Sequence, residues 1–576
     1  MLPDLGAELE RRIVDAVHAA LDVEITPEQA VIRPSAPGRA ADYQCNAAMP
    51  LAKRLGRPSR EIADAIAAHL DTTGLIADVA GPGFVNLTFT EEFLAAHLAA
   101  LAADDRLGVP EQAPLRVVID YSSPNMAKEM HVGHLRSTII GDALVRLHEE
   151  LGHEVIRQNH LGDWGTPFGK LVEHLVDEGL TSGELSIGDL NEFYVQASRK
   201  FDADPDFAER ARKRVVALQA GDPATLDLWR RLLEESKRHM EAVYALLGVR
   251  LTPADYMGES ACNDVLGSTC DELVAKGLAM PSEGALCVFP RGFTGREGAP
   301  VPLIIRKRDG GYNYDTTDLA TIRYRSQDLK GDLLLYVVGA PQALHFKMIF
   351  AAAREAEWLA PTSTATHVAF GSVLGSDGKV LGSRKGAGLK LADLLQEAVT
   401  RAAAIVADRS ELSADEQAEI ARAVGIGAVK YADLSTAREK DYVFDWDRMM
   451  SMDGNTATYL QYAHARIRSL IRKAADSGAG DGSANLLLAE PAERALALKL
   501  SQYPAAVTAA ARFAEPHRLC THLFETATAF STFYETCPVL TAGDAVRASR
   551  LALSTHTARV IRHGLALLGI QAPERL

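Results

Sequence analysis

The sequence lacks the features of membrane-spanning, secreted and zinc-ribbon proteins. None of its six cysteines forms a Cys-x-x-Cys pair, so neither a zinc site of that type nor a disulfide framework is expected, and the thiols are interpreted as buried or idle. The longest apolar runs, such as residues 333–338, are too short to cross a bilayer. Because the first residues show no basic region followed by an apolar run, we expect no secretory signal and a cytoplasmic protein.

An excess of positive charge is also missing. The net charge is −15, which by itself disfavours a nucleic-acid partner. From Ser451 onward, however, the chain contains 13 Lys and Arg against 10 Asp and Glu, so this part is relatively basic. Local patches can bind phosphates in an acidic protein because screening confines each contact to about 10 Å. So small an excess is equally compatible with ordinary variation in surface charge.

Length and composition predict several folded domains. The 576 residues are too many for one hydrophobic core, and 47% hydrophobic with 24% charged residues is typical of globular proteins. We predict a multidomain fold that combines α/β and all-α parts. Its domains are a small α+β domain over 1–105, a Rossmann-type parallel-sheet domain over 106–388 with a helical insertion at about 166–300, and a helical bundle over 389–576.

Hydrophobic periodicity supports this division. Apolar residues recur at helical spacing over 5–22 and 59–70, and residues 76–90 alternate around Gly81-Pro82-Gly83, which predicts two strands joined by a turn. Next come a buried strand, a helix and a second strand, an order that begins a doubly wound parallel sheet. The elements expected beyond the first domain are strands at 115–121, 154–158, 301–306, 333–338 and 366–370, a helix at 133–151 ending at Gly152, helices over 166–248, and an almost wholly helical region from about 389.

The sequence His131-Val132-Gly133-His134 lies between the first of these strands and its helix. Free N–H groups at a helix start favour an anion, and the helix dipole adds to this effect. Gly133 would let an adenine ring approach the backbone, and the imidazoles of His131 and His134 can donate hydrogen bonds to phosphate oxygens. Histidines also occur at helix starts without a catalytic role, but the strand-loop-helix context favours ATP binding and catalysis.

Longer motifs extend this signal over nearly the whole chain. They are residues 122–141 around the histidines, and residues 42–49, 81–86, 161–165, 424–433, 444–447 and 453–462. Through these motifs the chain resembles the arginyl-tRNA synthetases, which are class I aminoacyl-tRNA synthetases. The resemblance implies a ligase that activates L-arginine with ATP and Mg²⁺ and charges arginine tRNA, with the tRNA required for activation. We also expect a monomer, no membrane partner and no protein-bound structural metal.

The second class I signature, a loop containing Lys-Met-Ser-Lys in its full form, is incomplete here. The matching positions are 381–384, where leucine and Arg384 replace the two lysines. The resemblance implies that Lys128, just before the histidines, supplies the missing charge. A nearby cation stabilises the negative charge that spreads as pyrophosphate leaves. We predict Lys128 and Arg384 as catalytic and Ser383 and Lys385 as ATP-binding. A solvated basic turn is the alternative for Arg384 and Lys385.

Arginine selection requires acidic or amide groups around a planar guanidinium, which a carboxylate can bind in bidentate fashion. The resemblance implies that Asp120, where the family often has glutamate, and Asn125 hold the α-amino and backbone end of arginine. Tyr314, Asp318 and Gln342 are expected to bind the guanidinium end. The alternative role for Asp318 is that of a helix N-cap.

Two further side chains near these positions have competing interpretations. His345 is expected to face the nucleotide, and a structural role is its alternative. Trp164 is expected to pack or to shape its loop rather than to contact substrate.

The resemblance also implies two regions of tRNA contact. The helical C-terminal part is similar to an anticodon-binding bundle, in which we single out Tyr459, Gln461, Tyr462 and Arg466. Exposed aromatic rings there could stack on unpaired bases, whereas burial between helices is the alternative for each residue. The N-terminal domain of the family contacts the corner of the tRNA, for which Phe84 and Asn86 are the candidates.

Other functions are disfavoured by particular residues. A class I synthetase for another amino acid, such as cysteine, does not fit the missing zinc-type cysteine spacing or the presence of Tyr314 and Asp318. A catalytically inactive tRNA-binding relative does not fit the retention of both histidines and Lys128. A smaller nucleotidyltransferase would share the His-x-Gly-His chemistry but would not explain the flanking domains.

Overall fold

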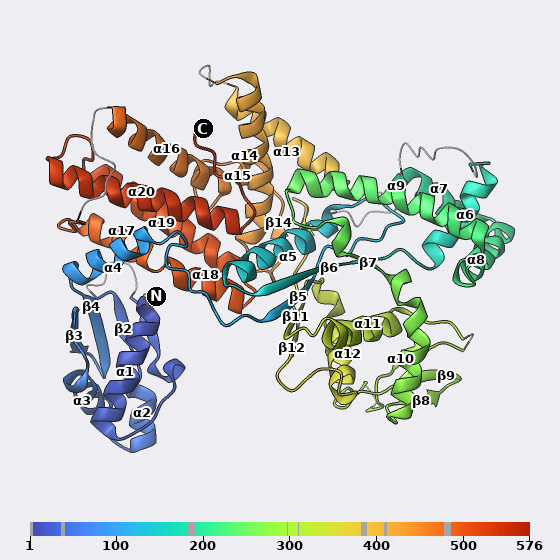
Figure 1. Cartoon of the computed structure of the whole chain (residues 1–576), viewed down its shortest axis with the longest axis horizontal. Coiled ribbons are helices and arrows are strands. Elements are labelled where there is room, and N and C mark those ends of the chain that lie inside the picture. The colour runs from blue at the N-terminus through green and yellow to red at the C-terminus, as the bar shows by residue number, and fades with distance from the viewer. Residues whose placement is uncertain are drawn as a thin grey trace. The chain divides into compact units, whose positions relative to one another are not determined.

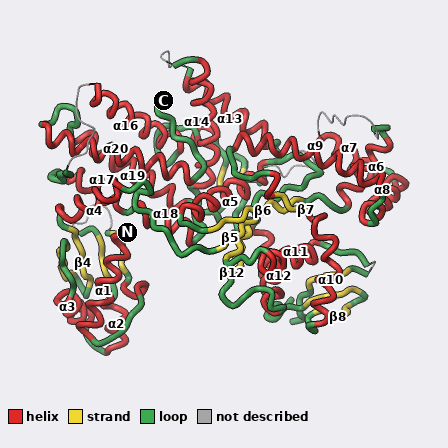
Figure 2. Tube along the Cα trace, viewed as in Figure 1, coloured by secondary structure: helices red, strands yellow, loops and turns green. Residues whose placement is uncertain are grey.

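The computed structural model describes residues 4–35, 41–180, 190–295, 298–308, 310–381, 389–407, 412–476 and 485–576. It divides into two compact units, whose elements can be followed in Figures 1 and 2. The first unit comprises residues 1–111, 452–566 and 571–576, and the second comprises residues 112–451 and 567–570. The division into three domains with boundaries near 105 and 388 stays a prediction.

A five-stranded sheet, in which every strand is parallel to its neighbours, forms the centre of the second unit (Figure 1). Its order is β12 (Thr364–His367), β11 (Leu333–Tyr336), β5 (Arg116–Asp120), β6 (Glu154–Leu161) and β7 (Tyr256–Gly258). Helix α5 (Val132–Glu150) connects β5 to β6 and packs against both strands. A parallel sheet covered in this way needs apolar side chains on both faces of its central strand, and residues 117–119 of β5 are all buried. The predicted Rossmann-type sheet is confirmed.

The strand order reverses at β5. The chain leaves β5 through α5 and adds β6 on one side, whereas β11 pairs with the other side of β5. In open α/β sheets, ligands bind beyond the carboxyl ends of the strands at such a reversal. The loop after β5 leads to His131, and the segment after β11 leads to Gln342 and His345. The topology therefore brings these segments to the edge where a ligand is expected.

Three short strands differ from the sequence expectation. Residues 303–306 form β10 (Leu303–Arg306), which pairs antiparallel with β9 (Ala285–Val288) in a separate sheet completed by β8 (Ala279–Ser282). Strand β7 has only three residues, too few to show a periodicity. Strand β14 (Tyr442–Val443) pairs with β13 (Val373–Leu374) inside the region predicted to be almost wholly helical.

Most helices of the second unit lie in the predicted helical regions, whereas α11 (Tyr314–Arg323) and α12 (Ala343–Glu355) were not predicted. The helices in the predicted regions are α6 (Thr166–Asp177), α7 (Leu190–Ala203), α8 (Pro205–Gln219), α9 (Pro223–Leu247), α10 (Asn263–Ala275), α13 (Leu391–Val406), α14 (Ala414–Leu434) and α15 (Trp446–Met449). Short helical turns are η2 (Pro253–Asp255), η3 (Glu259–Cys262), η4 (Tyr324–Asp328) and η5 (Ala340–Gln342).

A buried ion pair joins α5 to α14. The Arg136 guanidinium lies 3.1 Å from the Asp433 carboxylate, and both side chains are almost completely buried. Arg136 also donates to the Lys440 carbonyl at 2.9 Å. A buried charge whose partner is removed is costly, so this pair ties the first turns of α5 to the segment that leads into β14.

The first unit combines the two ends of the chain. Its N-terminal part contains a four-stranded antiparallel sheet, β1 (Ile32–Pro34), β2 (Tyr43–Cys45), β4 (Phe84–Phe89) and β3 (Leu75–Ala80), with α1 (Leu5–Leu21), η1 (Pro27–Ala30), α2 (Ala48–Leu55), α3 (Ser59–His69) and α4 (Glu91–Ala103). The predicted helices and hairpin are confirmed. The C-terminal helices are α16 (Ala457–Asp476), α17 (Pro491–Ser501), α18 (Tyr503–Arg512), α19 (His517–Thr536) and α20 (Asp544–Leu567).

An arginine of α17 joins these two parts. Arg494 makes bidentate hydrogen bonds of 2.7 and 2.8 Å to the Asp42 carboxylate and donates to the Phe89 carbonyl at 2.9 Å. Asp42 is buried and also accepts the Phe89 N–H. Paired hydrogen bonds of this kind fix orientation as well as distance. The Asp42 carboxylate is therefore an anchor between the N-terminal sheet and the C-terminal helices.

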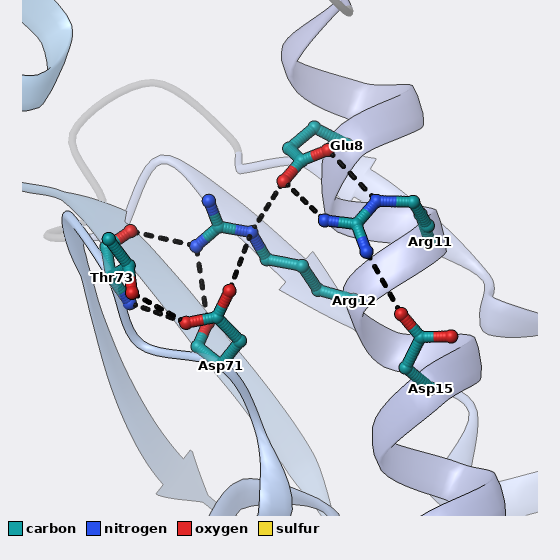
Figure 3. Close-up of polar contacts among 6 residues, drawn as sticks. All are labelled: Glu8, Arg11, Arg12, Asp15, Asp71 and Thr73. Atoms are coloured by element: carbon teal, nitrogen blue, oxygen red, sulfur yellow. Dashed lines mark hydrogen bonds and ion pairs between the residues drawn. The ribbon is translucent and has the colours of Figure 1, made fainter.

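Arg12 anchors a loop of the N-terminal part (Figure 3). Its guanidinium donates to Glu8 at 2.8 Å and to the carbonyls of Thr73 and Asp71 at 2.8 and 3.2 Å. The Arg12 side chain is 6% exposed, whereas that of its neighbour Arg11 is 59% exposed. Buried hydrogen bonds from a charged group stabilise more than surface ion pairs do.

We expect Arg12→Ala to lower the free energy of unfolding of the first unit by about 2 kcal/mol, because two loop carbonyls lose a charged donor. The matched control is Arg11→Ala, whose loss of exposed pairs with Glu8 and Asp15 should cost less than about 1 kcal/mol. Urea unfolding of both variants measures the difference. Equal destabilisation would contradict this role of Arg12.

Two general expectations can be compared with the structure. All six cysteines are buried, as expected. Among the described residues, every helix is either too short or too polar to cross a bilayer.

Candidate active site

The two histidines of the tetrapeptide cap the start of α5. His131 is the N-cap residue, and its Nδ1 accepts the Gly133 N–H at 3.0 Å. The His131 N–H in turn donates to His134 Nδ1 at 3.1 Å. A ring nitrogen that accepts a backbone N–H carries no proton of its own, so each neutral imidazole has its proton on Nε2. Both rings therefore present one N–H donor each.

Both imidazoles are neutral at physiological pH. Burial lowers the pKa of His131, and the positive charge of Lys128 lowers it further. Burial, followed by the neighbouring His131, lowers the pKa of His134 to about 3. Neutral Nε2–H groups can donate to a phosphate without a change of their protonation state near pH 7. The site thus contains two fixed, uncharged donors at a helix N-terminus.

Gly133 has a local structural reason to lack a side chain. A Cβ at this position would lie 2.6 Å from Cε1 of His131, closer than carbon atoms can approach. Any other residue would displace the imidazole from its capping position. Close approach of an adenine ring, the role predicted from the sequence, is compatible with this constraint but separate from it.

Lys128 projects from the same loop and is exposed. Its Nζ lies 4.4 Å from the centre of the Tyr194 ring in α7, a cation–π contact that holds the ammonium near the histidines. No local pattern connects Tyr194 with Lys128, because the two are 66 positions apart on different elements. Lys128 and both histidines are brought together as predicted.

The other predicted cations of the second signature, Arg384 and Lys385, lie with Ser383 outside the described residues. The described chain resumes at Leu389, whose carbonyl accepts the Val132 N–H at 3.3 Å. Lys390 forms an ion pair of 3.2 Å with Glu129. Leu389 and Lys390 are therefore held against Val132 in the first turn of α5 and Glu129 just before it.

A cavity of about 480 Å³ lies among η3, α10 and α11. Its lining includes Glu259, Tyr314, Thr317, Trp164 and Tyr312. Trp164 also packs edge-to-face against Trp229, so it both shapes its loop, as expected, and borders the cavity. Its walls combine aromatic rings with polar and acidic side chains, such as Asn263 and Asp264, a lining that suits a small polar ligand.

Glu259 is an acidic cavity residue that sequence reasoning missed. Burial raises its pKa to about 7, and repulsion from the carboxylates of Asp163 and Asp318 adds to this effect. The raised pKa shows that the ionised carboxyl is destabilised by its surroundings, so a cation that neutralises it would be bound favourably. Glu259 follows β7, a strand too short to recognise, so no local pattern marks it.

Asp318 forms a second acidic group beside this cavity. Its Oδ2 lies 2.6 Å from Nε2 of His345, whose Nδ1 lies 3.4 Å from Asp315. Burial alone would lower the pKa of His345, but the hydrogen bonds to Asp315 and Asp318 raise it to about 9. The N-cap alternative for Asp318 is wrong, because Asn313 occupies that position and Asp318 lies in the second turn of α11.

Tyr314 lines this cavity, and Gln342 precedes His345 by three residues. Tyr314 is 63% exposed, and the centre of its ring lies 5.1 Å from that of His345. Gln342 is exposed and immediately precedes α12. The structure thus brings Tyr314, Asp318 and His345 together, with Gln342 close to His345 in the chain.

Asp120 and Asn125 differ in their surroundings. Asp120 is buried, forms an ion pair of 2.8 Å with Arg325, and accepts the Ser123 hydroxyl at 3.0 Å. Asn125 is exposed, and its Oδ1 accepts the Ala127 N–H at 3.0 Å. The Asp120 carboxylate is therefore already engaged by the protein, through an arginine that sequence reasoning did not identify.

The predicted tRNA contacts of the N-terminal part lie on one face of β4. Phe84 and Asn86 alternate with buried residues, so their side chains share the partly exposed face of the strand. Asn86 Oδ1 accepts a hydrogen bond of 3.1 Å from Gln44 on β2. This bond fixes the amide so that its NH₂ group faces away from Gln44.

The candidates on α16 differ in exposure. Gln461 is fully buried and donates to the Gln571 carbonyl at 2.8 Å. Tyr459 is partly buried, with its hydroxyl 3.2 Å from Ser531 of α19. Tyr462 is also partly buried, whereas Arg466 is exposed and stacks 4.4 Å from the Tyr534 ring centre. Burial favours the packing alternative for Gln461, and exposure favours an outward role for Arg466.

Three family profiles match successive parts of the chain. The catalytic domain of class I tRNA synthetases of the arginine type matches residues 97–446. The arginyl tRNA synthetase N-terminal domain matches residues 7–89, and the DALR anticodon binding domain matches residues 460–576. The three matches together span almost the whole chain.

Individual relatives agree with these profiles over their full lengths. An arginine–tRNA ligase of Thermobifida fusca is 55% identical, with 100% of both chains covered, and one of Frankia casuarinae is 53% identical, with 97% of both covered. Arginyl-tRNA synthetase structures from Plasmodium falciparum and Thermus thermophilus superpose with TM-scores of 0.87 and 0.81, each at 26% identity, covering 100% and 99% of this chain and 100% of each of theirs. With its parallel-sheet catalytic domain, capped histidines and flanking domains, the chain belongs to the arginyl-tRNA synthetases of class I.

Proposed function

We propose that this chain activates L-arginine with MgATP and transfers the arginyl group to the terminal adenosine of arginine tRNA. The observation that carries this proposal is the cavity lined by Glu259, whose carboxyl feels the charge of the nearby Asp318, in the same unit as two neutral histidines at the reversal of the sheet. Carboxylates suit a planar guanidinium, and helix-start donors suit a phosphate. Full-length relatives named arginine–tRNA ligase support the same reaction.

The activation step joins arginine to AMP. A carboxylate oxygen of arginine attacks the α-phosphorus of ATP, and pyrophosphate leaves with the electrons of the broken P–O bond. We assign the Nε2–H groups of His131 and His134 to the phosphate oxygens on which charge grows, and the Lys128 ammonium to the same charge. Arg384, Ser383 and Lys385 are proposed to assist from the second signature, and Gly133 to pack against adenine.

Arginine recognition is assigned to two groups of residues. Asp318, with Tyr314 and Gln342, is proposed to bind the guanidinium, and Glu259 adds a second carboxylate. A lysine ammonium could not engage two carboxylates in the planar geometry that a guanidinium offers. Asn125 and Asp120 are proposed to hold the α-amino end, in which case Asp120 shares its carboxylate between Arg325 and the substrate. His345 then acts mainly by orienting Asp318.

Transfer completes the reaction. The 2′-OH of the terminal adenosine attacks the carbonyl carbon of the arginyl-adenylate, and AMP leaves. Phe84 and Asn86 are proposed to contact the corner of the tRNA, and Tyr459, Gln461, Tyr462 and Arg466 the anticodon stem-loop. Of the four, Arg466 is the most exposed and Gln461 has the least access. We further propose that the enzyme is a monomer that acts in the cytoplasm.

The test is tRNA-dependent charging of arginine by the purified protein, beside Lys128→Ala. The wild type should charge tRNA with arginine alone among the amino acids, and arginine-dependent pyrophosphate exchange should require tRNA. Lys128→Ala should lower kcat roughly tenfold, less than loss of a fixed donor, because the ammonium is exposed and partly screened.

The outcomes separate the parts of this proposal. Failure to charge any tRNA would exclude an active synthetase, and charging with another amino acid would exclude the arginine assignment. Robust exchange without tRNA would contradict tRNA-dependent activation only. An unchanged kcat in Lys128→Ala would show that Lys128 does not supply the missing positive charge, and would assign it to Arg384 or Lys385 of the second signature.

A further inference from the structure

We propose that Asp163 is a positioning residue for arginine selection, which holds the turn that carries Glu259 and aims this carboxyl into the cavity. The inference rests on the proposed function, because it concerns how the cavity recognises arginine. Asp163 itself is buried and does not line the cavity. It acts through its neighbours rather than by touching substrate.

The contacts of Asp163 fix the residue that follows Glu259. Asp163 Oδ1 accepts the Ser260 N–H at 2.9 Å, and Oδ2 accepts the Ser260 hydroxyl at 2.6 Å. The backbone of Asp163 is itself held, because Trp229 Nε1 donates to its carbonyl at 2.8 Å. A carboxylate that binds both the main chain and the side chain of Ser260 leaves the start of η3 little freedom to rotate.

The residue that precedes Glu259 is fixed against the same carboxylate. Leu161 at the end of β6 pairs with Gly258 at the end of β7, so the two chains leave the sheet side by side. A Cβ at Gly258 would overlap the carboxylate of Asp163. Gly258 and Ser260 thus both lie against Asp163, and Glu259 between them has its backbone held on each side.

Asp163 also acts on Glu259 through charge. The groups that face the Glu259 carboxyl are Asp163 after β6, Asp318 of α11 and the Cys262 thiol of η3. Asp264 of α10 lines the same cavity. The negative charge of Asp318 is compensated by its ion pair with His345 of α12. Repulsion by Asp163 and Asp318 adds to burial in raising the pKa of Glu259 to about 7.

Arginine binding is consequently linked to loss of a proton. The guanidinium pairs with the ionised form of Glu259, so the group must release its proton on binding when the pH is below its pKa. The affinity for arginine is therefore highest at a pH well above 7, and it falls as the pH drops through about 7. Removing the charge of Asp163 lowers the pKa of Glu259 and moves this fall to lower pH.

Three variants separate the positional from the electrostatic contribution. Asp163→Ala removes both hydrogen bonds to Ser260 and the charge, and Ser260→Ala removes the hydroxyl bond alone. Asp163→Asn keeps the geometry, because its amide can accept the Ser260 N–H and donate to the Ser260 hydroxyl, but it removes the charge. The matched control is Asp271→Asn on the same unit, an aspartate of α10 whose side chain is 81% exposed.

The measurements are arginine KM, ATP KM and kcat in tRNA charging from pH 6 to 9, with Tm for each variant. Asp163→Ala should raise the arginine KM about tenfold or more, as loss of hydrogen bonds to a charged group does, with kcat and ATP KM changed less than about threefold. Ser260→Ala should show a smaller rise in the arginine KM. Asp163→Asn should keep the wild-type arginine KM at pH 8.5 and shift the midpoint of its pH profile to lower pH.

Several results would overturn the inference while the wild type charges arginine normally. One is an unchanged arginine KM in Asp163→Ala. Another is an Asp163→Ala variant in which kcat falls and both KM values rise by similar factors. The third is a wild-type pH midpoint in Asp163→Asn. If Asp163→Ala does not fold, the pH midpoint of Asp163→Asn decides. A wild type that charges no arginine would instead overturn the proposed function, and this inference with it.

Discussion

His134→Asn is expected to lower kcat for arginine activation by about 10²- to 10³-fold, the effect of removing one fixed donor from a developing oxyanion. Asparagine can still place an oxygen near the position of Nδ1 and accept the His131 N–H, the bond that His134 makes at 3.1 Å. It cannot reach the position of Nε2. The variant therefore keeps the helix cap and loses the donor assigned to the phosphate.

His134→Gln provides the matched comparison. The longer side chain can bring an N–H to the position of Nε2, while it loses the capping contact at Nδ1. We expect it to recover part of the lost kcat, and to have a lower Tm than His134→Asn because the capping hydrogen bond is gone. Tm measurements on both variants separate a folding effect from a catalytic one.

The pH dependence provides an independent check of this assignment. Because burial lowers the pKa of His134 to about 3, its imidazole stays neutral throughout the range from pH 6 to 9. Its ionisation should therefore contribute no inflection to kcat in that range. The donor role would be ruled out if His134→Asn had the kcat of the wild type, or if His134→Ala were fully active.

Asp318→Ala is expected to raise the arginine KM about a hundredfold, the effect of removing one partner of a desolvated charge pair. Asp318 lies close enough to Glu259, which lines the cavity, for its charge to raise the pKa of Glu259, and it lies 2.6 Å from His345. Loss of this carboxylate leaves the guanidinium with one acidic partner. It also removes one of the two carboxylates that raise the pKa of His345 to about 9. The pKa of His345 is therefore lower in the variant, and its imidazole loses its positive charge at a lower pH.

Asp318→Asn separates these two effects. Asparagine can keep the hydrogen bond to His345 but carries no charge, so the arginine KM should rise less than in the alanine variant. The control is Asp328→Ala, an exposed aspartate in η4, the turn that continues α11. Arginine and ATP KM values from charging assays decide the outcome. An unchanged arginine KM, or an equal rise in both KM values, would refute the assignment.

Local patterns in the sequence were sufficient to predict the longer helices and strands that bury one face. Periodicity predicted α1, α3, α5 and the β3–β4 hairpin, because a long element repeats its apolar positions several times. The same signal is too weak for β7 and β14, which have three and two residues. Strand β10 was recognised, but its pairing with β9 could not be read from its own residues.

The sequence by itself determined the family, because long motifs in one order identify it, and it placed Lys128, His131 and His134 together at the start of one helix. Only the tertiary structure brought Glu259 to Asp318, Arg325 to Asp120 and Arg494 to Asp42. The physical reason is that these contacts join elements far apart in the chain. Burial and pairing of a charged side chain depend on what packs against it, and no local spacing encodes that.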